Sequence, residues 1–371
     1  PAESIPDAIE VDLNPSGWEQ HGHATNPDYE GVVLHVIVQH STRRYFSRTA
    51  GNSEVPQVCL ADHAPAEAEW DAIAPARPGR CLAPLRSLDS GSLLALLATA
   101  ATRRIERKGA LLETMIASRG ADAALYEAIA ITLGYKNNKL PFQLLAQRVP
   151  RRIAATPRGE AALFGISGFL ERPAPPAGAA RGTAARLWAS WWKQRAACAN
   201  SILPRTLWKL AGVRPANHPL RRVAALGVMA RRWKSIRAAL ESADQERLHD
   251  ALGALEHPFW SFHTTWNSPR HRKPLALLGP DRIRDIFANV ALPLAVSRGH
   301  DPAWLGLPAA APNAALAVVT TRLFGTPNPR VLPRKLFVQQ GLLQIYRDFC
   351  LHDHSECAQC AFPGLVGQLS G

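Results

Sequence analysis

The stretch Ala8-Ile9-Glu10-Val11-Asp12-Leu13 decides the fold class, because apolar and acidic residues alternate along it with a period of two. Successive side chains of a strand point to opposite faces, so the three aliphatic residues share one face while Glu10 and Asp12 share the other. Residues 32–38 form an almost unbroken aliphatic run, which is typical of a strand buried on both faces. A further short strand is expected over residues 55–60. The sequence therefore predicts a small N-terminal β-sheet.

From about residue 90 the pattern becomes helical, because apolar side chains recur three and four positions apart. We expect a helix over residues 93–108, capped by Ser90 or Ser92 and ended by Gly109, and a second helix over 111–119. Further helices are expected over residues 121–133, 140–148, 159–170, 183–199, 221–240, 282–292 and 335–347. The predicted fold class is α+β, with a small N-terminal sheet followed by a large and mostly helical region.

Three regions are predicted along the chain. Residues 1–85 form a β-rich core that carries a candidate site, and residues 86–170 form a helical region. Residues 183–371 form a second helical region, which ends in a cluster of cysteines. Residues 171–182 contain three prolines and two glycines, and this composition favours a linker.

Composition narrows the class of protein. The chain has 371 residues, 47% apolar and 20% charged, which is ordinary for a protein with a sizeable core and excludes wholesale disorder. No apolar stretch approaches the roughly 20 residues needed to cross a bilayer, so we expect a soluble, cytoplasmic protein. We also expect the natural protein to begin upstream of Pro1. P-loop, dinucleotide-binding, nucleophile-elbow and zincin motifs are absent from the sequence.

The charge of the chain points to a polyanionic partner. Lys and Arg number 43 against 30 acidic residues, which gives a net charge of +13 and favours nucleic acid. An arginine-rich composition from a GC-rich genome would give the same excess. Solvated helix ends and loops are the usual place of such residues. The positions we expect to contact nucleic acid are Arg231, Arg232, Arg270, Arg272 and Lys273.

The N-terminal strand carries a candidate catalytic site. Glu10 and Asp12 project the same way, roughly 7 Å apart at the backbone, and two carboxylates so placed can bind a divalent cation such as Mg²⁺ or Mn²⁺. His21 and His23 follow in an H-x-H spacing, and His35 lies within the second strand. Imidazoles there could ligate a transition metal or act as a general base. The alternatives are a solvated face of an edge strand for the two carboxylates and a locally satisfied core histidine for His35.

The C-terminus carries a candidate metal site of a second kind. Cys350 is followed after six residues by Cys357 and after two more by Cys360. A C-x-x-C pair can present two thiolates to one metal, and His352, His354 or the distant Cys81 could supply the fourth ligand. Such a set suits Zn²⁺, and four thiolates would equally hold a [4Fe–4S] cluster. The alternative is a group of reduced cysteines near a polar tail.

Several motifs resemble an uncharacterised bacterial family, domain of unknown function 2851. The likeness runs in order through Ile9-Glu10-Val11-Asp12, residues 17–23, Asp28-Tyr29, residues 32–37, Leu125-Tyr126-Glu127, residues 133–138, Pro141-Phe142, Leu145-Ala146, residues 214–219, Phe259-Trp260, His263, Asn289, Pro293 and the terminal cysteines. Family members usually carry His where Asp12 stands, and they have an upstream stretch with a Gly-Pro-Asp-Phe element that this sequence lacks.

The same order of elements more distantly resembles the PD-(D/E)xK nuclease superfamily. That resemblance implies a nuclease-like α/β core, incomplete at its N-terminus, in which Glu10 is a metal ligand and Asp12 stands where a lysine usually activates water. His21 or His23 would then supply the base. Cys81 with the three terminal cysteines is similar in layout to the clusters of iron–sulfur nucleases.

We therefore expect a nucleic-acid-binding protein that acts as a divalent-metal-dependent nuclease. The first alternative is a non-catalytic nucleic-acid-binding or interaction scaffold with a structural zinc or iron–sulfur site. The second is a metal hydrolase of small molecules, which would need a deep pocket beside His21, His23 and His35 without a basic rim.

Overall fold

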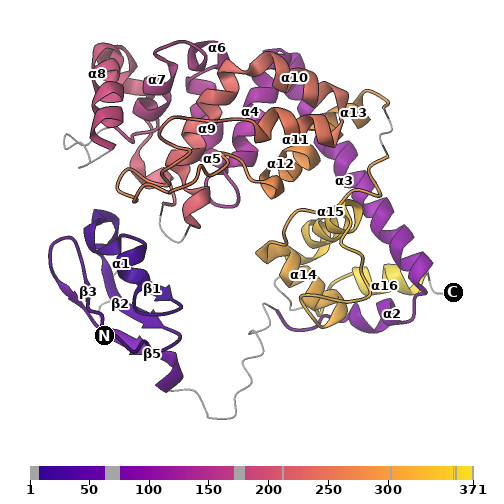
Figure 1. Cartoon of the computed structure of the whole chain (residues 1–371). Coiled ribbons are helices and arrows are strands. Elements are labelled where there is room, and N and C mark those ends of the chain that lie inside the picture. Colours follow the sequence, from indigo (N-terminus) through magenta and orange to yellow (C-terminus); the bar gives the residue numbers. More distant parts are fainter. Residues whose placement is uncertain are drawn as a thin grey trace.

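The computed structural model describes residues 8–62, 76–170, 180–210, 213–300, 303–353, 355 and 357–369. A β-rich N-terminal unit lies beside a large group of helices, and a smaller helical group contains the C-terminal elements (Figure 1). One long helix, α3 (Ser90–Arg119), runs from the smaller group into the larger one. The expected α+β class, with a small sheet followed by a mostly helical remainder, is confirmed.

The sheet of the N-terminal unit is parallel and has the strand order β1-β2-β5. Its strands are β1 (Ala8–Asp12), β2 (Val32–Ile37) and β5 (Gln57–Cys59). Glu10 lies opposite His35, so the two residues share one face. A short antiparallel pair, β3 (Ser47–Arg48) with β4 (Glu54–Val55), stands beside the sheet. The strand expected over residues 55–60 is thus divided between β4 and β5.

The segment between β1 and β2 covers one face of this sheet. It contains α1 (Gly17–Gln20) and the short 3₁₀ turns η1 (His23–Thr25) and η2 (Pro27–Tyr29). Trp18 and Tyr29 from this segment form a small core with Val32 and Val55.

The other face of the sheet is only partly covered. Leu34 and Val36 of β2, which pair with Ile9 and Val11, are half-buried, so the expectation that β2 is buried on both faces is wrong. Ile9, Val11 and Leu13 are exposed by 60%, 58% and 62% of their surface, while Asp12 is buried. The alternation along β1 is the one that the sequence predicts. The acidic face, however, is the covered one, because the segment with α1 and the β3–β4 pair both pack on that side.

The helices of the remainder follow in close succession. They are α2 (Leu82–Arg86), α3, α4 (Ala121–Leu133), α5 (Lys139–Arg148), α6 (Arg151–Ala154), α7 (Gly159–Ile166), α8 (Ala180–Cys198), α9 (Pro219–Arg231), α10 (Trp233–Ser242), α11 (Gln245–Gly253), α12 (Pro280–Ile286), α13 (Leu292–Ser297), α14 (Ala314–Phe324), α15 (Leu336–Ile345) and α16 (Phe362–Gly367). Two π-helical turns, η7 (Phe287–Ala291) and η8 (Tyr346–Cys350), continue α12 and α15. Within the described residues, we find no helix with the length and apolarity that a bilayer crossing requires.

Helix α3 differs from the expectation of two shorter helices separated at Gly109. Gly109 lies inside the helix, where an added Cβ would come within 2.7 Å of the carbonyl oxygen of Pro293. This glycine therefore permits close packing against α13 instead of ending the helix. The cap also differs, because the Asp89 side chain accepts hydrogen bonds from the backbone N–H groups of Gly91 (2.7 Å) and Ser92 (3.0 Å).

The helix expected over residues 221–240 is two helices, because α9 ends before Arg232 and α10 begins at Trp233. Of the expected linker at 171–182, residues 171–179 lie outside the described residues and 180–182 begin α8.

Two hydrophobic cores hold the helices together. The larger contains residues from both predicted helical regions, for example Leu125 and Ile286. The smaller joins Cys81 and Leu85 to Phe362 and Val366 near the C-terminus. The region boundaries at 85/86 and 170/183 stay predictions.

Candidate metal centre

Asp12, the last residue of β1, is the centre of the site. Its carboxylate is buried, with Oδ1 3.1 Å from Nδ1 of His21 and Oδ2 3.2 Å from Nε2 of His35. Gly17, where α1 begins, makes room for it, because an added Cβ there would lie 2.5 Å from Cγ of Asp12. The turn into α1 therefore brings the backbone directly against this carboxylate.

His35 orients Asp12 through a chain of hydrogen bonds. Nε2 of Gln57 donates to Oγ of Ser47 (2.8 Å), and this oxygen lies 2.6 Å from Nδ1 of His35. Burial lowers the pKa of His35 and favours the neutral ring. Nδ1 then accepts from the Ser47 hydroxyl and the Nε2–H group donates to Asp12. Both ring nitrogens of His35 therefore have hydrogen-bond partners, as in the alternative of a locally satisfied core histidine.

His23 has a free ring nitrogen. Its ring is buried and stacks on Tyr29 with 3.9 Å between the ring centres. Nε2 lies 4.0 Å from Oε1 of Glu10, and buried Nδ1 has no hydrogen-bond partner among the described residues. Burial lowers the pKa of His23 to about 4, so the ring is neutral near pH 7 and keeps a lone pair for a ligand.

Asp12, His21 and His23 form a group that can hold a metal ion. One carboxylate oxygen and one nitrogen of each histidine all lie within 4.8 Å of one another. The sequence predicts that Glu10 and Asp12 bind the metal together, but this group contains Asp12 without Glu10. Glu10 instead stands at its edge, half-buried and facing His23.

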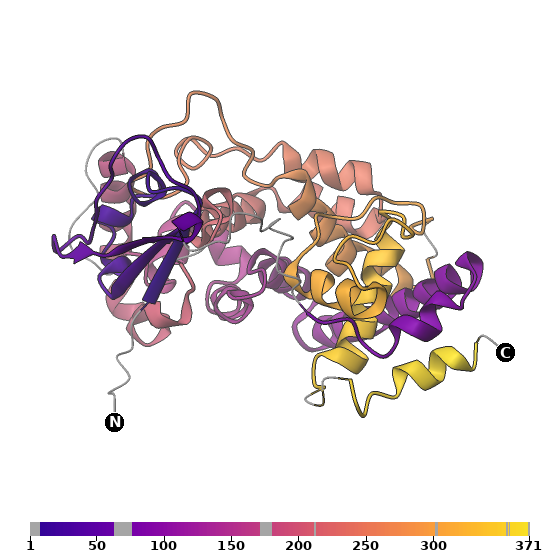
Figure 2. The ribbon, with the colours of Figure 1, turned by 90° about the horizontal axis from the view of Figure 1, so that it is seen from below.

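The neighbours of Glu10 shift its pKa in opposite directions. Burial raises its pKa, and the negative charge of Asp12 adds to this effect, while the proximity of His21 and Lys209 lowers it. Lys209 belongs to the helical region, so this region contributes to the site. The neighbouring ion pair between Arg205 and Asp28 (2.9 Å) joins the same two parts of the chain, which lie next to each other in Figure 2.

The backbone of Lys209 is held by one side chain, that of Asn138. The Lys209 N–H donates to Oδ1 of Asn138 (2.8 Å), and Nδ2 of Asn138 donates to the Lys209 carbonyl oxygen (2.9 Å). Asn138 is itself buried. Sequence reasoning missed Lys209, and no local pattern could have revealed it, because its role depends on a contact between distant segments.

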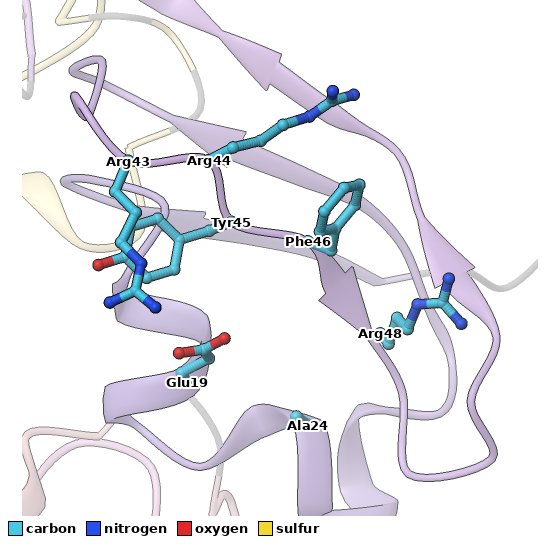
Figure 3. Close-up of a pocket in the computed structure, with 7 residues that line it drawn as sticks. All are labelled: Glu19, Ala24, Arg43, Arg44, Tyr45, Phe46 and Arg48. Carbon is cyan, nitrogen blue, oxygen red and sulfur yellow. The ribbon is translucent and has the colours of Figure 1, made fainter.

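A pocket of about 310 Å³ lies beside the segment that carries His21 and His23. Figure 3 shows Tyr45 and Phe46 on one stretch of chain between the arginines. The guanidinium groups of Arg43 and Arg44 lie over the rings of Tyr45 and Phe46, 5.7 and 5.1 Å from the ring centres. The pocket is lined by Glu19, Ala24, Arg43, Arg44, Tyr45, Phe46 and Arg48. Sequence reasoning missed this pocket, although four consecutive basic and aromatic residues, 43–46, were a visible signal.

Residues 6–303 match the model of a family described as a protein of unknown function (DUF2851). The chain belongs to the DUF2851 family. The match includes Asp12, His21, His23 and Lys209, and it ends before the three terminal cysteines. No curated protein and no solved structure matches the chain.

The basic residues expected to contact nucleic acid lie on the surface of this DUF2851 chain. Arg231, Arg232, Arg270, Arg272 and Lys273 are all exposed. Two further arginines next to these patches are not available to a ligand. Arg221 and Arg222 are buried, and Arg221 donates to the carbonyl oxygens of Trp260 (2.9 Å), Leu275 (2.7 Å) and Ala276 (2.8 Å).

The four cysteines that the sequence singled out lie close together in the DUF2851 chain, outside the N-terminal unit. Burial raises the pKa of the Cys81 thiol to about 12, and the proximity of Cys350, Cys357 and Cys360 adds to this effect. Burial also raises the pKa of Cys350 and Cys357. All six cysteines are free of disulfides.

Proposed function

We propose that this chain is a nucleic-acid-binding protein that hydrolyses phosphodiester bonds at a divalent metal ion held by Asp12, His21 and His23. The observation that carries this proposal is the convergence of one carboxylate and two imidazoles within 4.8 Å. A donor set with two imidazoles favours a transition ion such as Mn²⁺ over Mg²⁺, which prefers oxygen ligands.

Each residue of the site has a role in this proposal. A divalent ion polarises a phosphoryl oxygen and lowers the pKa of a bound water. Glu10 is the general base, because its raised pKa makes its carboxylate a better proton acceptor. Lys209 supplies positive charge near Glu10, where negative charge develops on the phosphate. His35 is a positioning residue, since it contacts Asp12 and Ser47.

The substrate class is inferred from the surroundings of the metal group. Three arginines and two aromatic rings line the neighbouring pocket, and the whole chain carries a net charge of +13. Arginines neutralise phosphates, while aromatic rings stack on unpaired bases and are tolerant of sequence. We therefore propose a single-stranded nucleic acid, or a single-stranded part of one, as the substrate.

The test is cleavage of end-labelled single-stranded DNA, duplex DNA and RNA by the purified chain with Mn²⁺ or Mg²⁺. We expect cleavage with Mn²⁺, and a loss of about 100-fold or more in Asp12→Asn and His23→Gln. His249→Gln is the matched control, because His249 is exposed and distant in sequence from the site, and it should cleave like the wild type. Equal activity in Asp12→Asn and the wild type would contradict the proposal.

A non-catalytic nucleic-acid-binding scaffold is the second candidate. It is favoured by the fact that both oxygens of Asp12 already have an imidazole partner, as in a purely structural network. The two candidates differ in their response to Asp12→Asn. The scaffold predicts no cleavage by the wild type, together with salt-sensitive nucleic-acid binding that survives the substitution.

A further inference from the structure

The four clustered cysteines come from three separate places in the chain. Cys81 directly precedes α2, Cys350 ends the π-turn after α15, and Cys357 and Cys360 lie in the turn before α16. Figure 1 shows α2 and α16 together in the smaller helical group. Gly79 lies between the sulfurs, because an added Cβ there would be 3.2 Å from Sγ of Cys81 and 3.2 Å from Sγ of Cys357.

The spacing of the sulfur atoms distinguishes between two kinds of metal group. On a single tetrahedral zinc with Zn–S bonds of about 2.3 Å, the sulfurs would be about 3.8 Å apart. Among the described potential ligands, however, no three of these four sulfurs lie within 4.8 Å of one another. In a [4Fe–4S] cluster each thiolate binds a different iron, so the four sulfurs surround a larger body. Every set of three of these sulfurs therefore contains at least one separation above 4.8 Å, which exceeds the spacing on one zinc ion and fits the cluster.

The surroundings suit a buried anionic group. Cys81 and Cys357 are buried, and the aromatic rings of Phe349 and Phe362 pack into the same core. Two cations flank the thiols. Arg80 donates to the carbonyl oxygen of Cys357 (3.4 Å), and Arg322 donates to that of Cys350 (3.2 Å). Hydrogen bonds and nearby charge are the means by which a protein stabilises such a cluster.

The turn that carries Cys357 has an unusual backbone. Cys357 has a φ of 75°, in the left-handed region that residues other than glycine rarely adopt. Its N–H donates to Oδ2 of Asp353 (2.7 Å), which holds the turn in this shape. Strained conformations of this kind persist where the position of a side chain matters, and here the side chain is a thiol facing Cys81 above Gly79.

We propose that Cys81, Cys350, Cys357 and Cys360 bind a [4Fe–4S] cluster that fastens the C-terminal segment to the beginning of α2. The proposal is independent of the metal-dependent nuclease function, since it involves neither the N-terminal unit nor its ligands. The cluster adds four iron–sulfur bonds to a small core, between segments that are more than 260 residues apart in the sequence.

The test is anaerobic purification of the full chain, followed by reconstitution with ferrous iron and sulfide. We expect about four irons and four acid-labile sulfides per chain, with the Mössbauer spectrum of a cubane cluster. Cys81→Ser and Cys357→Ser should each lose the cluster. Cys59→Ser and Cys198→Ser are the matched controls, because these cysteines lie outside the group, and both should retain it.

Two results would overturn the proposal. One is a single zinc per chain in the wild type, with no iron taken up on reconstitution. The other is an unchanged iron content in Cys357→Ser. Because a serine variant can fail to fold, circular dichroism should accompany each measurement. The metal stoichiometry of the wild type decides the matter even if both variants are unfolded.

Discussion

Exchange of Gly17 for alanine perturbs the proposed metal group without removing a ligand. The added Cβ would lie 2.5 Å from Cγ of Asp12 and 2.6–2.7 Å from its two oxygens. Such atoms normally approach to about 3.5 Å, so the carboxylate must move by about 1 Å. Since Asp12 is buried between His21 and His35, this shift weakens both contacts.

The size of the effect follows from this displacement. Overpacking of a buried site costs about 1–3 kcal/mol, and we expect the lower part of this range because the clash is with a side chain. A misplacement of 1 Å lowers the rate of a reaction at a positioned site by roughly 100-fold. We therefore expect the free energy of unfolding to fall by about 1–2 kcal/mol and the Kd for Mn²⁺ to rise by about 10- to 100-fold.

Calorimetric titration with MnCl₂ and urea unfolding of the same protein measure both quantities. Gly31→Ala is the matched control, because nothing lies within 4 Å of a Cβ added there, and its Kd should equal that of the wild type. If Gly17→Ala binds Mn²⁺ as tightly as the wild type, the reasoning about Asp12 is refuted.

Three further predictions concern pH, nucleic acid and packing. Burial lowers the pKa of His23 and of His218 to about 4 and also lowers the pKa of His35, so the folded chain loses stability as the pH falls from about 6.5 to about 4. In urea unfolding without metal, His23→Gln should remove part of this loss of stability, and an unchanged pH dependence would contradict the buried neutral ring of His23. The double variant Arg43→Ala/Arg44→Ala should weaken binding of single-stranded DNA and lower the slope of log Kd against log salt by about 1.5. Fluorescence anisotropy measures both, and Arg330→Ala is the control because Arg330 is also exposed. An unchanged slope would exclude the pocket as a nucleic-acid contact. Gly109→Ala should lower the free energy of unfolding by about 1–3 kcal/mol, because the added Cβ contacts Pro293. Gly364→Ala is the control and should not lower it, because a Cβ there meets open space. Equal unfolding midpoints for Gly109→Ala and the wild type would show that α3 does not pack closely at Gly109.

The local pattern of β1 predicted part of the site correctly. A period of two placed Glu10 and Asp12 on one face, and this depends only on the geometry of a strand. Which face is covered depends on where the segment with α1 and Trp18 packs, and a single strand carries no information about that. The acidic face was therefore found, but its burial could not be derived from the sequence.

Contacts between distant segments account for what sequence reasoning missed. Lys209 is brought toward Glu10 by Asn138, which lies 71 residues earlier in the chain. Gly109 looks like the end of a helix until the carbonyl of Pro293 is seen against it. The close spacing of the terminal cysteines, by contrast, was visible in the sequence, because three of the four lie within eleven residues.

Anomalous diffraction from a crystal soaked in MnCl₂ tests the central claim most directly, because it locates the ion itself. The account predicts an anomalous peak within about 2–2.5 Å of a carboxylate oxygen of Asp12 and of one nitrogen each of His21 and His23. A crystal of the wild type with no peak at these three side chains, or with the only peak elsewhere, would contradict it.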